Sequence, residues 1–194
     1  MDTVTSVREQ IIDAALALVA DRGIAATSID DIAAAAGVAK GSIFYNFGSK
    51  SGLFAAIIGE GVARLTTALG DAADSRTGQD AIDALVTELL RQICDHPDFA
   101  KLVITEIFRR GRDWQESIGT IRDEAIGTFA AAARQAWPER DPDLTGAAVF
   151  GATLLAGLDW LVFQPERSLE DVRRAVLATV VTVSARPTDQ GIVE

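Results

Sequence analysis

The stretch TSIDDIAAAAGVAKGSIFYNFGSKSGLF, residues 27–54, places two short helical segments on either side of Gly37. Ser28 and Asp31 have the spacing of a capping box, which begins a helix, and a glycine at position 37 can adopt the left-handed conformation that ends one. A second short helix is expected over residues 40–47. Two short helices joined by a turn of about three or four residues are typical of a helix-turn-helix.

Small and apolar side chains occupy the positions where two crossing helices would touch. Ala33 allows the second helix to pass close, and Ile43, six residues beyond Gly37, returns an aliphatic side chain to the shared core. The same spacing also arises by chance in alanine-rich helices, so an ordinary helical corner is the alternative. The residues that flank the turn decide between these two interpretations.

The flanking residues carry a local excess of positive charge. The whole chain has a formal net charge of −10, which argues against general adhesion to nucleic acids or membranes. Residues 33–54 nevertheless contain two lysines, Lys40 and Lys50, and no acidic residue. Lys50 falls in the first turn of the next helix, where its ammonium and the free backbone amides can hold one phosphate together. The sequence therefore predicts a small, local DNA contact.

The second short helix offers donors on its exposed side: Lys40, Ser42, Tyr45 and Asn46. Such groups suit base edges and phosphate oxygens. Few cationic contacts imply a weak salt dependence and weak binding by one subunit. Useful affinity then requires two copies of the chain on two half-sites of a palindromic double-stranded operator.

Residues 27–54 resemble the signature of the TetR-type (tetracycline-repressor-like) bacterial transcription regulators. The resemblance implies an all-α fold with a three-helix helix-turn-helix DNA-binding domain, residues 1–48, and a larger helical domain, residues 49–194, for ligand binding and dimerisation. It implies that the second short helix, residues 40–47, is the reading helix that faces the operator, and that Phe47 packs beneath it. It also implies these DNA-binding residues: Ser28, Lys40, Gly41, Ser42, Tyr45, Asn46 and Lys50.

Two positions depart from that family pattern. Ala39 stands where the family usually has a serine or threonine that caps the reading helix, a cap worth about 1 kcal/mol. Phe44 stands where a tyrosine is common, and Tyr45 follows it.

The rest of the chain is expected to be helical, because apolar residues recur at intervals of three and four and no stretch alternates long enough to form a strand. The expected helices cover residues 6–23, 49–69, 80–95, 97–110, 114–137, 143–163 and 168–185.

Small residues on the expected helix 143–163, such as Ala148, Gly151 and Ala152, would allow another helix to approach closely. The expected helices 143–163 and 168–185 together can form half of a four-helix bundle between two subunits. The alternative is that both helices only close the core of one subunit. The resemblance favours a homodimer through these two helices.

Apolar residues of the central helices are candidates for the lining of a small-molecule effector pocket, although the same spacing is also typical of plain core. Phe108 and Trp114 flank Gly111 and would frame a pocket mouth. The candidate ligand-binding residues are Phe99, Val103, Phe108, Trp114, Ile118 and Phe129.

Other functions are disfavoured by the sequence. Cys94 is the one cysteine, and Cys94 with His96 lacks the further ligands of a metal site. Because neither a glycine-rich phosphate loop nor a second histidine is present, we expect no metal, no cofactor and no enzyme. The apolar run 147–163 contains Asp159 and is shorter than the roughly 20 residues of a membrane span. It is expected to be a buried helix.

These patterns predict a dimeric repressor that a small molecule releases from its operator. No secretory signal opens the chain, so a cytoplasmic location is expected. The alternative is a helical carrier of an apolar ligand that has lost its DNA role.

Overall fold

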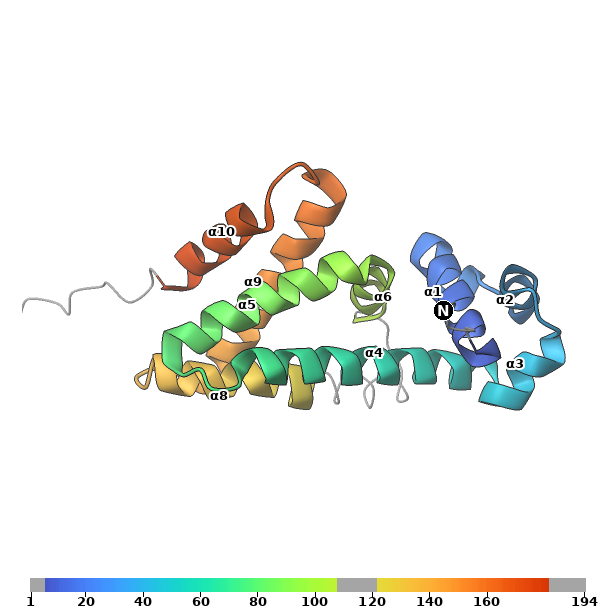
Figure 1. Ribbon diagram of the computed structural model, residues 1–194, viewed down its shortest axis with the longest axis horizontal. Coiled ribbons are helices and arrows are strands. Elements are labelled where there is room, and N and C mark those ends of the chain that lie inside the picture. Colours follow the sequence, from blue (N-terminus) through green and yellow to red (C-terminus); the bar gives the residue numbers. More distant parts are fainter. Residues whose placement is uncertain (1–5, 108–121, 182–194) are drawn as a thin grey trace, which may run out of the picture.

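The computed structural model describes residues 6–107 and 122–181, and every regular element within these ranges is helical (Figure 1). The prediction of an all-helical fold is confirmed. The first elements are α1 (Val7–Ala26), α2 (Ile29–Ala36), α3 (Lys40–Phe47) and α4 (Lys50–Ala73). They are followed by α5 (Gly78–Asp95), α6 (Pro97–Ile107), the π-helical turn η1 (Arg122–Ile126), α8 (Gly127–Ala136), α9 (Pro142–Phe163) and α10 (Leu169–Val181).

Helices α1, α2 and α3 form a small unit at one end of the molecule (Figure 1). The hydroxyl of Ser28 accepts a hydrogen bond from the backbone N–H of Asp31 at 3.1 Å, and Asp31 reciprocates, so the predicted capping box is present. Ile11, Ile32 and Ile43, one from each helix, are completely buried. This apolar contact fixes α3 against the other two helices.

Two helices, α1 and α4, continue at least three residues beyond their predicted ends. Gly23 interrupts α1 as expected, with φ 78° and ψ 163°, but a further short helical turn continues to Ala26. Helix α4 extends four residues beyond the predicted end, to Ala73. The chain leaves the helix just before Ser75, whose φ of 62° is positive.

The long helix α4 connects the N-terminal unit to the rest of the protein (Figure 1). It packs against α3 at its beginning and against α5 further along. The side chain of Ser49 accepts a hydrogen bond from the N–H of Gly52 at 2.9 Å and begins the helix. Leu53 and Leu69, near its two ends, are both fully buried. Any tilt of α4 therefore moves its contact with α3.

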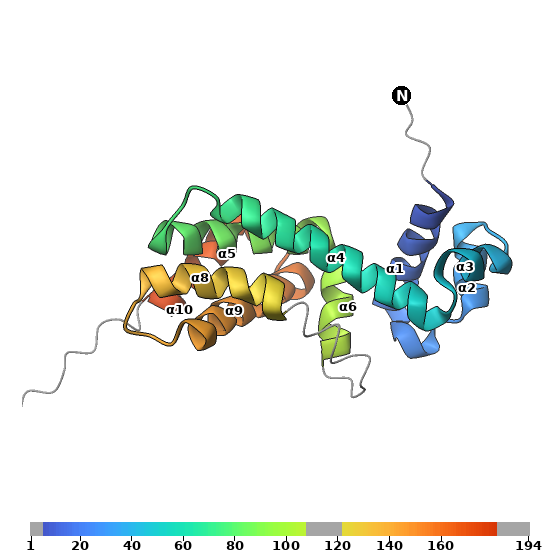
Figure 2. The same ribbon diagram turned by 90° about the horizontal axis from the view of Figure 1, so that it is seen from below.

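The larger part of the protein is a bundle in which α8 and α9 pack on α5, and α10 covers α5 and α9 (Figure 2). The approach of α8 and α9 is close, because a Cβ added to Gly146 would lie 2.5 Å from the backbone nitrogen of Ala130. Phe129 and Phe150 meet edge to face, with ring centroids 5.7 Å apart. Helix α6 lies between this bundle and α1 and packs on both.

Helices α4 and α9 are long and apolar enough, by length and composition alone, to cross a membrane. Helix α9 is also longer, at 22 residues, than the apolar run seen in the sequence. Each helix nevertheless turns one face into the protein core, as Val149, Thr153 and Leu158 do from α9. A core helix of this kind passes the same test of length and composition.

Candidate nucleic-acid interface and ligand cavity

The turn between α2 and α3 is built on Gly37, which has φ 67° and ψ 29°. Its N–H donates to the carbonyl of Ala34 at 3.3 Å, and the N–H of Val38 donates to the carbonyl of Ala33 at 3.0 Å. These bonds satisfy the free carbonyls at the end of α2 and turn the chain sharply. Helix α3 begins without a side-chain hydrogen bond from Ala39, as its sequence implies.

Helix α3 turns one side to the core and the other to solvent. Ile43 is completely buried, whereas Tyr45 is 91% exposed and Phe44 is 45% exposed. Lys40, Gly41 and Asn46 are also exposed, and Ser42 is half-buried. The surface thus combines hydrogen-bonding groups with two aromatic rings, and an apolar ring can contact the methyl group of thymine.

Lys40 is paired with an acidic residue of the preceding helix. Its Nζ lies 2.8 Å and 2.9 Å from the two carboxylate oxygens of Asp30, and both side chains are exposed. The positive charge predicted for this surface is therefore partly neutralised before any phosphate arrives. Asp30 lies three residues outside the acid-free window 33–54, so the window alone did not reveal the pair.

Two further predicted contact residues already have hydrogen bonds within the chain. The hydroxyl of Ser28 donates to Asp31 at 2.7 Å, and these bonds from Ser28 hold the pKa of the Asp31 carboxyl below its usual value. The side-chain amide of Asn46 donates to the carbonyl of Ser42 at 2.8 Å. Ser28 therefore caps the start of α2, and the side-chain amide of Asn46 is bonded to the preceding turn of α3.

The end of α3 is fixed against α1 and α4. Lys50 is half-buried in the first turn of α4. Phe47 packs against the core, with the guanidinium of Arg8 lying 5.3 Å from its ring centroid. Arg8 also forms an ion pair with Glu60 of α4. The orientation of α3 thereby depends on α4.

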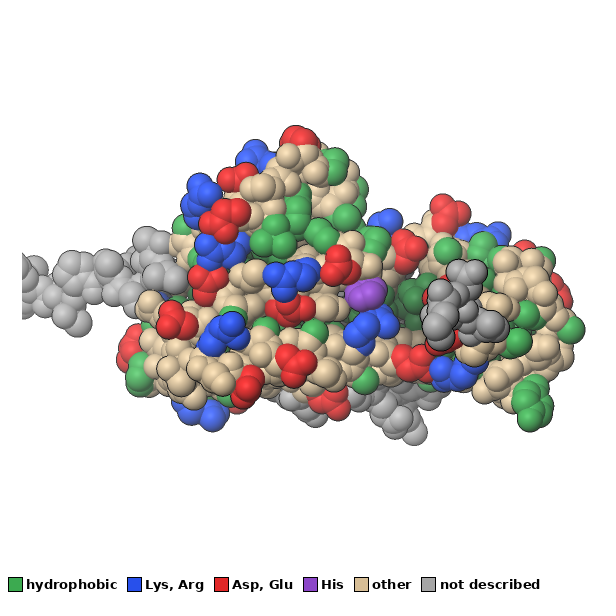
Figure 3. All heavy atoms as spheres, in the orientation of Figure 1, with side chains coloured by type: hydrophobic (Ala, Val, Ile, Leu, Met, Phe, Trp, Pro, Cys, Tyr) green, Lys and Arg blue, Asp and Glu red, His purple; other side chains and the backbone are tan. Residues whose placement is uncertain are grey.

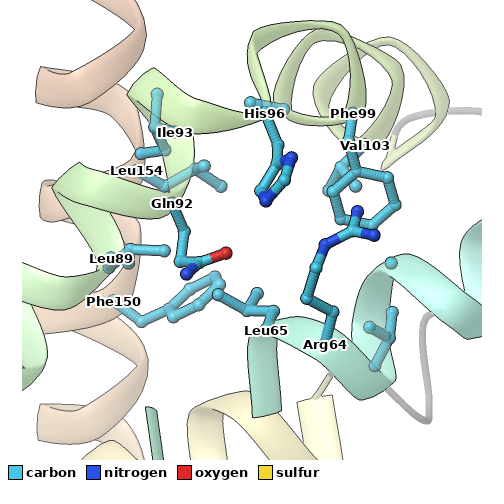
Figure 4. A pocket seen from close by; sticks show the side chains of 13 residues that line it. Arg64, Leu65, Leu89, Gln92, Ile93, His96, Phe99, Val103, Phe150 and Leu154 are labelled. Carbon is cyan, nitrogen blue, oxygen red and sulfur yellow. The ribbon is translucent and has the colours of Figure 1, made fainter. Parts of the chain in front are cut away.

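A cavity of about 40 Å³ lies between α4, α5, α6 and α9 (Figure 4). Its walls are almost entirely apolar, with Phe99 and Val103 from α6 and Phe150 and Leu154 from α9. Its size corresponds to only a few water molecules. A larger ligand therefore requires a side chain or a helix to move.

Three polar side chains surround the same space in the cavity: Arg64 of α4, Gln92 of α5, and His96, which directly follows α5 (Figure 4). The guanidinium of Arg64 lies 5.9 Å from the ring centroid of Phe99. Burial, and next the charge of Arg64, lower the pKa of His96, while Asp95 opposes this shift. Figure 3 shows the single histidine beside a basic side chain, near the junction of the bundle and the N-terminal unit.

Residues 11–57 match the model of the family described as bacterial regulatory proteins, tetR family. Over 50 residues the chain is 46% identical to the HTH-type transcriptional regulator AcrR of Shigella flexneri, a match that covers 26% of this chain and 23% of AcrR. In this segment the chain therefore resembles the TetR-type regulators. The aligned segment spans less than a quarter of that relative, so the family match is a match of the DNA-binding region.

Solved structures share the fold of this chain along nearly its whole length. A fatty acid metabolism regulator of Clostridium perfringens has a TM-score of 0.82 at 22% identity, covering 92% of this chain and 100% of that one. FadR of Bacillus halodurans has a TM-score of 0.81 at 19% identity, covering 95% and 100%. FadR of Bacillus subtilis, solved with stearoyl-CoA, has a TM-score of 0.75 at 19% identity, covering 89% and 97%.

Some of the expected ligand-binding residues line the cavity. Phe99 and Val103 line it, whereas Phe129 is fully buried against Phe150 and is absent from the lining. Phe108, Trp114 and Ile118 lie outside the described residues. The polar residues of the cavity could not be grouped from the sequence, because Arg64 lies on a different helix and far in the sequence from Gln92 and His96.

Proposed function

We propose that this chain is a homodimeric transcriptional repressor that binds a palindromic operator through α3 and is released by a small molecule bound in the cavity. The observation that carries the proposal is the surface of α3. Tyr45 is almost fully exposed on this short helix, whose direction is determined by the turn at the left-handed Gly37. Both residues lie within the segment that matches the tetR family. A helix held in this way can enter the major groove.

The dimer is proposed to form through α9 and α10. Helix α9 leaves large apolar side chains exposed in a single subunit, including Leu144 at 73%, Leu155 at 66% and Phe163 at 76%. Small exposed residues accompany them, among them Gly151 on α9 and Ala175 on α10. A second copy would cover this face and place two reading helices about 34 Å apart.

The division of the chain into a DNA-binding domain, residues 1–48, and a ligand-binding and dimerisation domain, residues 49–194, fits this proposal. Helix α4 begins at this boundary and contacts α3, while α6 contacts both the cavity and α1. A ligand that displaces α4 or α6 would thus change the position of α3. If it preferred the released state by 100-fold, it would supply about 2.7 kcal/mol against DNA binding.

An apolar effector suits the cavity, and one neighbour in fold, FadR of Bacillus subtilis, was solved with stearoyl-CoA. A repressor of this kind would act in the cytoplasm, without metal, cofactor or enzymatic activity of its own.

Selection of binding sites from random duplex DNA with the full-length protein tests the proposal. We expect a palindromic sequence to be enriched and then bound in a gel shift. Tyr45→Ala and Lys50→Ala should weaken this binding at least tenfold, because base contacts of this kind contribute about 1–3 kcal/mol. Circular dichroism should show unchanged helix content.

Arg76→Gln is the matched control. It removes one exposed positive charge that lies just beyond the end of α4, far from α3. It should leave operator affinity unchanged. Failure to enrich any sequence, even at low salt, would overturn the repressor and favour a carrier of apolar ligands.

A further inference from the structure

The lining of the cavity lacks the acidic residues that dominate the rest of this chain. The sequence has 28 acidic residues against 18 lysines and arginines. The cavity lining nevertheless contains one arginine, one histidine and one glutamine, and no carboxylate. The nearby carboxylate of Glu88 lies outside the lining and is bonded to Gln92 and Arg91. The cavity is therefore electrostatically unlike the surface around it.

Arg64 is the positively charged residue of the cavity lining. Among the side chains of residues 6–103 and 124–180, its partner is the aromatic ring of Phe99, and no carboxylate there lies within ion-pair distance of it. A guanidinium forms strong paired hydrogen bonds with carboxylates and phosphates. The imidazole of His96 points toward the same space and can donate a further hydrogen bond (Figure 4).

We propose that the cavity binds an amphipathic anion, an apolar chain with a carboxylate or phosphate at one end, and that Arg64 contacts the anionic group. This rests on the proposed function only in taking the cavity as the effector site. The apolar walls formed by Val62, Leu89 and Phe150 receive the chain. A ligand without an anionic group leaves the cation–π contact between Arg64 and Phe99 in place.

Phe99 must move for such a chain to enter, because the present cavity of about 40 Å³ is too small for it. The Phe99 ring lies directly on Gly61 of α4, where an added Cβ would overlap it. An anion that draws Arg64 away removes a cation–π contact from this ring. Ligand binding thereby loosens the contact between α6 and α4, and α6 also packs on α1.

Isothermal titration calorimetry of the full-length protein without DNA tests this proposal separately from operator binding. The probes are decanoate, decanoyl-CoA and the uncharged decanol. We expect decanoate or decanoyl-CoA to bind at least tenfold more tightly than decanol. Arg64→Gln should remove this preference, whereas Arg64→Lys should retain part of it and Arg76→Gln all of it.

The two anionic probes identify the source of the charge. Preference for decanoate indicates a free carboxylate, and preference for decanoyl-CoA indicates the phosphates of the thioester carrier; both agree with an amphipathic anion. Equal binding of decanol and the anions would overturn the proposal, as would binding that Arg64→Gln and Arg76→Gln affect equally, or no binding of any probe. A protein that binds decanoate but selects no operator would leave this inference standing while the repressor function fails.

Discussion

Gly52 of α4 faces the carbonyl oxygen of Phe47, the last residue of α3, so closely that a Cβ at position 52 would overlap this oxygen. The obstructing atom belongs to the backbone and cannot rotate away. The reading helix and α4 are therefore joined by a contact that only glycine permits. The angle between the two helices depends on it.

We expect Gly52→Ala to lower the free energy of unfolding by about 1–3 kcal/mol, because the added methyl forces the two backbones apart. Operator affinity should fall as well. Urea unfolding and a gel shift measure the two effects. Gly59→Ala is the control, since nothing lies within 4 Å of an added Cβ there and alanine favours the helix. Equal stability of the two variants would show that α3 and α4 can separate at this junction at no cost.

The ion pair between Asp30 and Lys40 predicts that Asp30→Asn strengthens operator binding several-fold. The pair is exposed, so it contributes at most about 1 kcal/mol to stability, but its carboxylate repels the phosphates that Lys40 would contact. The slope of log affinity against log salt should steepen by about one unit as Lys40 is freed. Gel shifts at several salt concentrations measure this.

Asp71→Asn, which removes an exposed carboxylate at the far end of α4, serves as the control for this prediction. Weaker binding by Asp30→Asn with a changed base preference would instead mean that Asp30 accepts a hydrogen bond from a base.

Local signals allowed the N-terminal unit to be predicted from the sequence. The capping pair of Ser28 with Asp31 and the left-handed Gly37 involve only residues close in sequence, and both have the expected geometry. The end of α4 was predicted less well. Polar residues after Leu69 do not end a helix unless the backbone changes direction, which happens at Ser75.

The cavity could be predicted only in part, because it is a product of tertiary packing. Phe99 and Val103 of α6 were named from helical spacing and do line it. The same spacing does not distinguish Phe129, which faces Phe150 in the core. Arg64 lies on a different helix from His96, so their convergence depends on how α4 and α5 cross.

The exposed Leu155 predicts that Leu155→Glu separates the proposed dimer. The side chain is 66% exposed in one subunit, so a charge there costs the subunit little, whereas in a dimer it would be buried without a partner. Sedimentation velocity should show the monomer mass, and circular dichroism should show unchanged helix content. Ala131→Glu, at an exposed position of α8, should remain dimeric. A wild-type chain that sediments as a monomer would refute the proposed interface.

The single histidine allows the environment of the cavity to be measured by NMR titration. We expect the pKa of His96 below its ordinary value of 6.5, mainly through burial and next through the charge of Arg64. Arg64→Gln should raise this pKa, and Asp95→Asn should lower it further. Unchanged values in both variants would mean that His96 does not sense these charges.

A lowered pKa of His96 also has a consequence for stability. The unfolded chain binds the proton more readily than the folded one, so stability is complete above about pH 6.5 and falls as the pH drops through the folded pKa. Urea unfolding of wild type and His96→Gln at about pH 8 and about pH 5 measures this difference. The wild type should lose more stability than the variant.

The overlap between Gly61 and Phe99 predicts that Gly61→Ala imitates the ligand. The clashing atoms form the far edge of the Phe99 ring, so the ring can swing away from α4 while the backbone stays in place. We expect operator affinity without ligand to fall several-fold, and stability to fall by about 1–3 kcal/mol. Adding Phe99→Leu, which removes the clashing ring edge, should restore part of the affinity. If Gly61→Ala binds operator like Gly59→Ala, contact between α4 and α6 at this point does not control the reading helix.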